Sequence, residues 1–147
     1  MQTSEAIERL LYDSMPLARA MEVRATMYEP PVLVLEAPLE RNHNHLGTAF
    51  GGSIACLAML TGYALLWAEL GDPKAHVVLK ECNIRYLRPI QGKLRARAAL
   101  PQGEPLEEFK TLFHRKSKGR LMLKVELEDG VSGAVAAVFE GEFVAIR

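Results

Sequence analysis

The sequence predicts an α+β fold in which an antiparallel sheet is wrapped around one long central helix. Two observations carry this prediction. Residues 46–68 contain no charged side chain, and the strand-like segments arrive in consecutive pairs instead of alternating with helices. The chain has 147 residues, of which 49% are apolar and 24% are charged, so it can bury one core without disulfides or metals. We therefore expect a single domain over residues 1–147.

The first part of the chain predicts a helix followed by a hairpin. Apolar residues at helical spacing predict a short amphipathic helix over residues 4–14, with Ser4 as its N-cap. Apolar and polar residues then alternate over residues 21–28, and a more apolar run over residues 32–35 follows a turn at two prolines. Such a pair of runs is typical of two antiparallel strands.

The most apolar part of the chain follows an irregular loop. Residues 38–52 have no periodicity and are rich in Asn, His and Gly, which is typical of an ordered loop with special geometry. Residues 53–70 then predict a helix that is apolar on every side. We expect no membrane span, because the uncharged stretch contains several Gly, Thr and Ser residues and lacks a basic flank. The expected cover for this helix is a sheet of the same protein.

The C-terminal half predicts four strands and one short helix. The strands cover residues 76–87, 94–100, 121–127 and 131–146. A change of parity within the first of them predicts a bulge near Lys80 or Glu81. The helix carries its apolar residues between positions 106 and 113, and Gly119 is placed to close it.

The loop before the long helix is the strongest candidate for a functional site. Its segment 43–53, HNHLGTAFGGS, places backbone N–H groups at the positive end of a helix dipole, where an oxygen that gains negative charge is stabilised. The segment resembles the Asn-x-x-Gly-x-x-His-Gly-Gly motif of acyl-CoA thioesterases with the hot dog fold. The resemblance is closest to the thioesterase domain found alone or behind an N-acetyltransferase domain in some bacterial proteins, and it extends to residues 82–89, CNIRYLRP.

The resemblance implies a fold, an assembly and an activity. In that superfamily a sheet wraps a central helix, two subunits pair to form the sites, and acyl thioesters are hydrolysed. The family asparagine and glycines fall on Asn44, Gly47, Gly51 and Gly52. The histidine and the acidic residue of better-studied relatives are replaced here by Phe50 and Met59, so the usual carboxylate is absent from the central helix.

Other residues of the loop are candidates for the missing base. His45 and His43 can take a proton near neutral pH, and Glu40 is a carboxylate before the helix, where another hot dog group places its acid. By resemblance, Asn44 orients water or the carbonyl, and the amide of Gly51 is the oxyanion donor. The candidate catalytic residues are therefore Asn44, His45, Gly51 and Glu40. The candidate substrate-binding residues are His43, Gly47, Thr48, Phe50, Gly52, Met59, Arg85 and Arg88.

The net charge of zero conceals two regions of opposite charge. Residues 74–120 carry twelve bases and four acids, for a net charge of +8, so the rest of the chain carries −8. A uniformly basic nucleic-acid binder is excluded, and aromatic residues are not interleaved with the bases. Two interpretations of the basic segment stay open: a solvated face of strand and helix, or a site that recognises phosphate or an acidic carrier protein.

We expect neither a metal nor a resident cofactor. His43 and His45 form an HxH half-site, but no neighbouring Cys, Asp or Glu completes a familiar metal-binding spacing. Cys56 and Cys82 lie in apolar sequence without a CxxC motif, so we expect buried thiols in a protein of the reducing cytoplasm. Coenzyme A or phosphopantetheine enters only as part of the substrate.

The sequence therefore predicts a hydrolase that acts on acyl thioesters of coenzyme A or of an acyl carrier protein. The expected assembly is a homodimer or a dimer of dimers, because one sheet around one helix leaves a flank that pairing completes. The alternative is a hot dog module that binds acyl thioesters without hydrolysing them, since Phe50 and Met59 stand where the histidine and the acid are expected. Nucleic acid is not an expected partner.

Overall fold

A computed structural model describes residues 2–147. The predicted domain began at Met1, which lies outside the described residues. It contains four α-helices, one 3-10 helix and six strands within that range. In chain order these are α1 (Ser4–Ser14), α2 (Pro16–Ala20), β1 (Arg24–Glu29), β2 (Val32–Ala37), η1 (Leu39–Arg41), α3 (Gly51–Leu70), β3 (His76–Tyr86), β4 (Leu94–Ala99), α4 (Glu104–Lys116), β5 (Lys118–Asp129) and β6 (Val135–Ile146).

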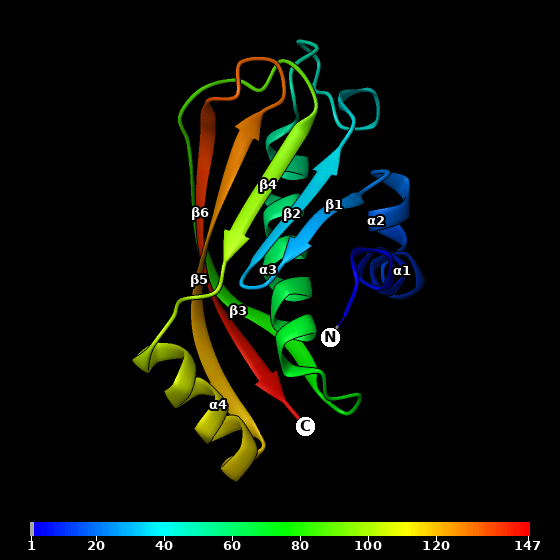
Figure 1. Cartoon of the computed structure of the whole chain (residues 1–147). Coiled ribbons are helices and arrows are strands. Elements are labelled where there is room, and N and C mark those ends of the chain that lie inside the picture. The colour runs from blue at the N-terminus through cyan, green and yellow to red at the C-terminus, as the bar shows by residue number, and fades with distance from the viewer. Residues whose placement is uncertain (1) are drawn as a thin grey trace.

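The six strands form a single antiparallel sheet, in the order β1-β2-β4-β5-β6-β3. Figure 1 shows α3 running along one face of this curved sheet, with the loop that precedes it at one end and α4 beyond the other end. Residues of β5 alternate between buried and exposed, so one face of the sheet covers α3 and the other faces outward. The predicted α+β architecture of a sheet around a central helix is confirmed.

The helix α3 is the core of the molecule. It is apolar around its whole circumference, and Leu57, Leu65 and Leu66 are fully buried. Burial of each leucine side chain contributes about 1.5–3 kcal/mol. Gly62 permits the close approach of helix and sheet, because a Cβ at this position would overlap the ring of Phe143. By length and composition α3 could cross a membrane, but 56% of its most apolar window is buried inside this fold.

Two helix boundaries differ from the prediction, and one short helix was not predicted. The first helix is capped by Thr3, whose Oγ1 accepts a hydrogen bond from the amide of Ala6, and not by Ser4. The long helix begins at Gly51, two residues before the predicted start. A further helix, α2, was not predicted; it begins at Pro16, since proline lacks only an N–H that has no partner in the first turn.

The closure of α4 also differs from the prediction. Ser117 takes the left-handed conformation, with φ of 58°, and its N–H donates to the carbonyl of Phe113. Gly119 lies instead inside β5, where a Cβ would come within 2.9 Å of the ring and the carbonyl of Phe109. This glycine therefore serves the packing of α4 on the sheet. The tight turn falls two residues earlier.

Two features of the strands complete the comparison. The predicted bulge in β3 is confirmed by a register shift between Leu79 and Glu81. The last strand begins at Val135 and not at position 131, because the carboxylate of Asp129 holds the preceding turn. Its Oδ1 accepts hydrogen bonds from the amides of Gly92 and Val131, at 3.1 and 3.0 Å.

Candidate functional site

The loop before α3 is a compact turn that is bonded to the body of the fold. We call residues 38–50 the pre-helix loop. Its two arms are joined by the amide of Asn44, which donates to the Thr48 carbonyl at 2.7 Å, and by the amide of Phe50, which donates to the Asn42 carbonyl at 2.7 Å. The amide of Ala49 donates to the carbonyl of Ile90 at 2.9 Å, which ties the loop to the segment before β4. These bonds fix the place where α3 begins.

Asn44 shapes the turn at the tip of this loop. Its Oδ1 accepts hydrogen bonds from the amides of Leu46 and Thr48, at 2.9 and 3.2 Å, and its Nδ2 donates to Oγ1 of Thr48 at 2.9 Å. Gly47 has φ of +81°, a conformation that side chains disfavour, and its amide donates to the Asn44 carbonyl. The spacing of Asn44 and Gly47 is therefore explained by the turn itself. Both ends of the Asn44 amide group are engaged within the loop.

The first turn of α3 presents backbone donors that have no partner. Within residues 2–147, no acceptor bonds the amides of Gly51, Gly52 or Ser53, and Phe50 at the N-cap supplies no side-chain bond. The Phe50 side chain is 55% exposed, and its ring lies over Gly52, where a Cβ would overlap it. Unbonded amides at the positive end of a 20-residue helix are suited to bind an oxygen that carries or gains negative charge.

Tyr86 contacts the same turn from the end of β3, and it was not among the predicted site residues. Its hydroxyl donates to the carbonyl of Gly51 at 2.8 Å, and a Cβ at Gly51 would meet its ring at 3.4 Å. Burial, with a smaller contribution from Cys82, raises the pKa of Tyr86, so the hydroxyl keeps its proton at neutral pH. The position of this tyrosine in the segment CNIRYLRP was the signal that could have singled it out.

The candidate bases lie on the outer side of the pre-helix loop. His43, His45 and Glu40 are exposed, and Glu40 belongs to η1. Nδ1 of His43 donates to the carbonyl of Asn44 at 2.9 Å, which leaves its Nε2 as the nitrogen able to accept a proton. Within the described residues, the side chains of His45 and Glu40 make no hydrogen bond or ion pair.

The structure does not bring every predicted residue to this turn. Met59 is half-buried against the core, eight residues or about 12 Å along the axis of α3 from Gly51. Arg85 and Arg88 are exposed. Because side chains alternate along a strand, Arg85 lies on the opposite face of β3 from Tyr86.

A recess of about 350 Å³ opens beside the first turn of α3, between this helix and α2. It is lined by Leu17, Ala20, Met21, Arg41, Asn42, Phe50, Gly52, Ser53 and Cys56. Burial raises the pKa of the Cys56 thiol, so the sulfur is protonated at neutral pH and is a weak nucleophile. Most of its lining is apolar, so the recess offers an apolar wall next to the unbonded amides.

One polar group of this recess has no partner. The side chain of Asn42 is held by its Nδ2, which donates to the carbonyls of Met21 and Pro38 at 3.1 and 2.7 Å. Its Oδ1 is buried and receives no hydrogen bond from the described residues. Such a group is unusual in a folded protein and marks a place where a bound donor would be stabilised.

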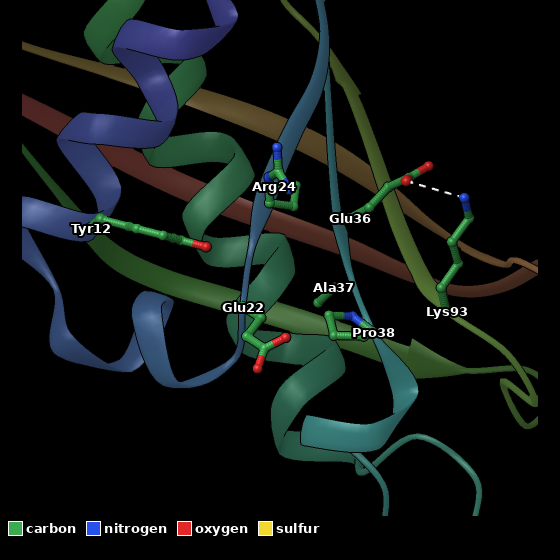
Figure 2. A pocket seen from close by; sticks show the side chains of 7 residues that line it. All are labelled: Tyr12, Glu22, Arg24, Glu36, Ala37, Pro38 and Lys93. Carbon is green, nitrogen blue, oxygen red and sulfur yellow. Dashed lines mark ion pairs between the residues drawn. The ribbon is translucent and has the colours of Figure 1, made fainter.

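A second cavity, of about 370 Å³, lies on the other side of the hairpin (Figure 2). Its charged lining is already paired. Glu36 contacts Lys93 at 3.2 Å and Arg95 at 2.7 Å, while Arg24 and Glu22 form ion pairs with Glu8 and Arg41. Neutralised carboxylates of this kind are typical of structural ion pairs, so this cavity is a weaker candidate than the start of α3.

Neither cysteine forms a disulfide, and their environments differ. Cys56 is half-buried, whereas Cys82 is exposed on β3, so the expectation that both are buried is wrong for Cys82. Cys82 shares the inner face of β3 with Ile84 and Tyr86, but its side chain at this edge strand stays exposed. Within residues 2–147, no group of three or more His, Cys, Asp or Glu side chains could hold a metal ion.

Comparisons with known proteins agree with this geometry. The family model described as "Putative thioesterase (yiiD_Cterm)" matches residues 4–147. A Chlorobaculum tepidum TLS protein of unknown function is 27% identical, with 98% of this chain and 94% of that chain covered and a TM-score of 0.89. A "putative thioesterase" from Shewanella oneidensis is 25% identical, with 98% and 97% covered and a TM-score of 0.86. A "probable thioesterase" from Pseudomonas aeruginosa is 25% identical, with 99% and 96% covered and a TM-score of 0.82.

Proposed function

The chain belongs to the thioesterase family of the YiiD C-terminal type and has its hot dog fold, and we propose that it hydrolyses acyl thioesters of coenzyme A or of an acyl carrier protein. The observation that carries this proposal is the set of three unbonded amides at the start of α3, on Gly51, Gly52 and Ser53. Such donors act on the charge that develops in acyl transfer, so they favour a hydrolase over a simple binding module.

The proposed chemistry is the addition of water to the thioester. A base takes one proton from water as the water oxygen attacks the carbonyl carbon, and the carbonyl oxygen becomes an oxyanion that accepts hydrogen bonds from the amides of Gly51 and Gly52. The intermediate then collapses with cleavage of the carbon–sulfur bond. The thiolate leaves and recovers the proton held by the base, which releases the free acid and the thiol.

Three loop residues are the candidate bases, and geometry ranks them. His43 is the best oriented, because its Nδ1 bond to the Asn44 carbonyl fixes the ring with Nε2 free. His45 and Glu40 are exposed without such a bond. The three substitutions His43→Gln, His45→Gln and Glu40→Gln, compared by the pH profile of kcat, separate these roles.

The recess between α2 and α3 supplies a place for the acyl chain. Its apolar residues adjoin Gly52, one of the two proposed oxyanion donors. Asn44 acts in this proposal as a positioning residue, since its side chain builds the loop that sets the first turn of α3. Phe50 and Gly52 border both the amides and the recess.

We also infer that the protein assembles as a homodimer through the outer edge of β3. Within residues 2–147 nothing pairs with this edge, and Val78, Tyr86 and Leu87 beside it are exposed. An unpaired strand of 11 residues is a ready template for a second copy. Pairing of two copies would also bring a second chain next to Tyr86 and Gly51. Light scattering in solution tests the assembly, and a dimer of dimers is the larger state that it would detect.

The experiment that tests the activity is a panel of acyl-CoA and acyl carrier protein thioesters of graded chain length, with the released thiol measured directly. We expect thiol release with saturation kinetics for at least one chain length. Saturable binding of these thioesters without any thiol release would contradict hydrolysis and establish the binding module instead.

A further inference from the structure

The largest cavity described in this fold lies away from the start of α3, on the outer face of the sheet. We call it the basic groove. Its volume is about 720 Å³, and it lies between α4, the first residues of β3 and β5, and the last residues of β6. It is lined by Val78, Lys80, Leu112, Lys116, Lys118, Gly119, Arg120, Val144 and Ile146. None of these residues belongs to the site proposed above.

The groove combines an apolar floor with a cationic rim. Val78, at 51% exposed, and Ile146, at 38% exposed, supply aliphatic surface from two adjacent strands, with Val144 buried beneath them, and Leu112 of α4 forms the wall. Isolated apolar side chains on a surface need no explanation, but a lined groove of this kind marks a binding surface.

The cations on its rim are available to a partner. Among residues 2–147, no carboxylate pairs with Lys116, Lys118 or Arg120. Only Lys80 has a partner, Glu142 at 3.7 Å, and both side chains of that pair are solvent-accessible. Glu108 and Arg120 line a neighbouring cavity together but form no ion pair. The groove is therefore positive, and an occupant must bring negative charge together with apolar surface.

We propose that the basic groove is the docking surface for an acidic amphipathic helix of the acyl carrier protein that delivers the substrate. This inference rests on the proposed thioesterase function and chooses between its two thioester donors. A helix laid along the groove would place its apolar stripe on Val78 and Ile146 and its carboxylates on Lys118 and Arg120. Coenzyme A fits less well, because no aromatic side chain lines the groove to stack on adenine.

The position of the groove indicates which site it serves. Ion pairing of Lys110 with Glu69 at 2.6 Å attaches α4 to the last turns of α3, so the groove lies about 30 Å from Gly51 of the same chain. The proposed dimer shortens the separation along the sheet, while the groove stays on the outer face and the Tyr86–Gly51 contact on the inner face. When two β3 edges pair antiparallel, the end of β3 that carries Val78 lies beside the partner's end of β3, where Tyr86 contacts Gly51. A carrier protein docked on one protomer would therefore lie nearer to the site of the partner than to the site of its own chain.

Binding of purified holo-acyl carrier protein tests the proposal without reference to hydrolysis. The double variant Lys118→Glu/Arg120→Glu should raise Kd by about tenfold or more, and the wild-type Kd should rise between about 50 and about 300 mM salt. The control Arg9→Glu changes one exposed cation on α1, far from the groove in sequence and fold, and should stay within about twofold of wild type. A neutral pair, Lys118→Gln/Arg120→Gln, guards against damage to folding and should give an intermediate Kd.

Two outcomes would overturn the docking proposal. The first is an equal Kd for the wild type and the charge-reversed variant. The second is that the charge-reversed variant increases KM for acyl-CoA as much as it increases KM for the acyl carrier protein thioester. That result would identify the groove as a nucleotide site instead. Tight carrier binding that depends on the groove, without hydrolysis of any thioester, would leave the docking proposal standing while the proposed activity fails.

Discussion

Two different kinds of surface lie near the two ends of α3. At its start, the groups that face a ligand are backbone amides of Gly51, Gly52 and Ser53, with no charged side chain in the first turn. Near its far end, the basic groove is built from Lys118, Arg120 and other side chains on an apolar floor. Amides fixed by a helix are already oriented toward a developing charge, whereas long cations attract a partner from a distance and hold it loosely. The comparison suggests chemistry at one end and recognition at the other.

The sharpest way to break this comparison is to disturb the turn that sets the amides. Asn44→Ala removes four hydrogen bonds inside the pre-helix loop, so we expect kcat to fall by about 100-fold, the loss typical of a missing oxyanion donor. KM should change much less, because the amides act on the transition state. Steady-state kinetics measure both.

A matched variant separates shape from chemistry at this position. Asn44→Asp keeps an acceptor for the amides of Leu46 and Thr48 and loses the two donations from Nδ2, to Thr48 Oγ1 and to the Ala49 carbonyl. We expect it to retain more activity than Asn44→Ala. A rise in KM with an unchanged kcat for the alanine variant would show that Asn44 serves binding alone.

The recess at the start of α3 offers the next largest effect. Ala20 lines it from α2, and Ala20→Phe would fill part of its volume. We expect the ratio of kcat/KM for long to short acyl chains to fall by about tenfold, because each methylene that loses its apolar pocket weakens binding. Ala99→Phe, on an exposed position of β4, is the control. A ratio that stays constant in both variants would place the acyl chain elsewhere.

The hydroxyl of Tyr86 should have a smaller effect. Tyr86→Phe keeps the ring against Gly51 and removes one hydrogen bond. A bond of about 1 kcal/mol corresponds to about a fivefold loss of kcat, while KM and the melting temperature stay near the wild-type values. Tyr28→Phe is the matched control, since the Tyr28 hydroxyl makes no hydrogen bond within residues 2–147. A change in KM alone would assign Tyr86 to substrate contact and not to positioning of the turn.

Sequence reasoning succeeded where a pattern extends over many residues. The uncharged segment and the paired strands predicted the central helix and its sheet, and the parity change predicted the bulge beside Lys80. The sequence did not predict helix boundaries that depend on the backbone conformation of a single residue. Pro16 begins a helix, and Ser117 takes the left-handed conformation that glycine was expected to supply.

The candidate site was predictable only in part, for a similar reason. The motif located the loop, because Asn44 and Gly47 are needed for its turn whatever the substrate. Tyr86 could not be assigned, since its contact with Gly51 joins residues 35 positions apart through the fold. The basic groove was missed for the same reason. A surplus of charge was visible in the sequence, but only the packing of α4 on β5, with β6 and β3 alongside, gathers Lys116, Lys118 and Arg120 on one apolar floor.

The smallest effect on activity is expected at Asp129, a buried carboxylate that holds the turn between β5 and β6. Hydrogen bonds from the Val131 amide first, and from neighbouring amides, lower the pKa of this carboxyl against the opposing effect of burial. Because the folded-state pKa is below the unfolded value, its contribution to stability is complete above about pH 4 and is lost as the pH falls through the folded-state pKa. Asp129→Asn should therefore lower the free energy of unfolding by about 1–3 kcal/mol at neutral pH, with a difference from wild type that shrinks in acid, while kcat stays unchanged. Urea unfolding at a series of pH values measures this difference. A loss of kcat at neutral pH in a variant that remains folded would instead assign this carboxylate a role in catalysis. It would also contradict the view that the chemistry depends on the backbone amides at the start of α3.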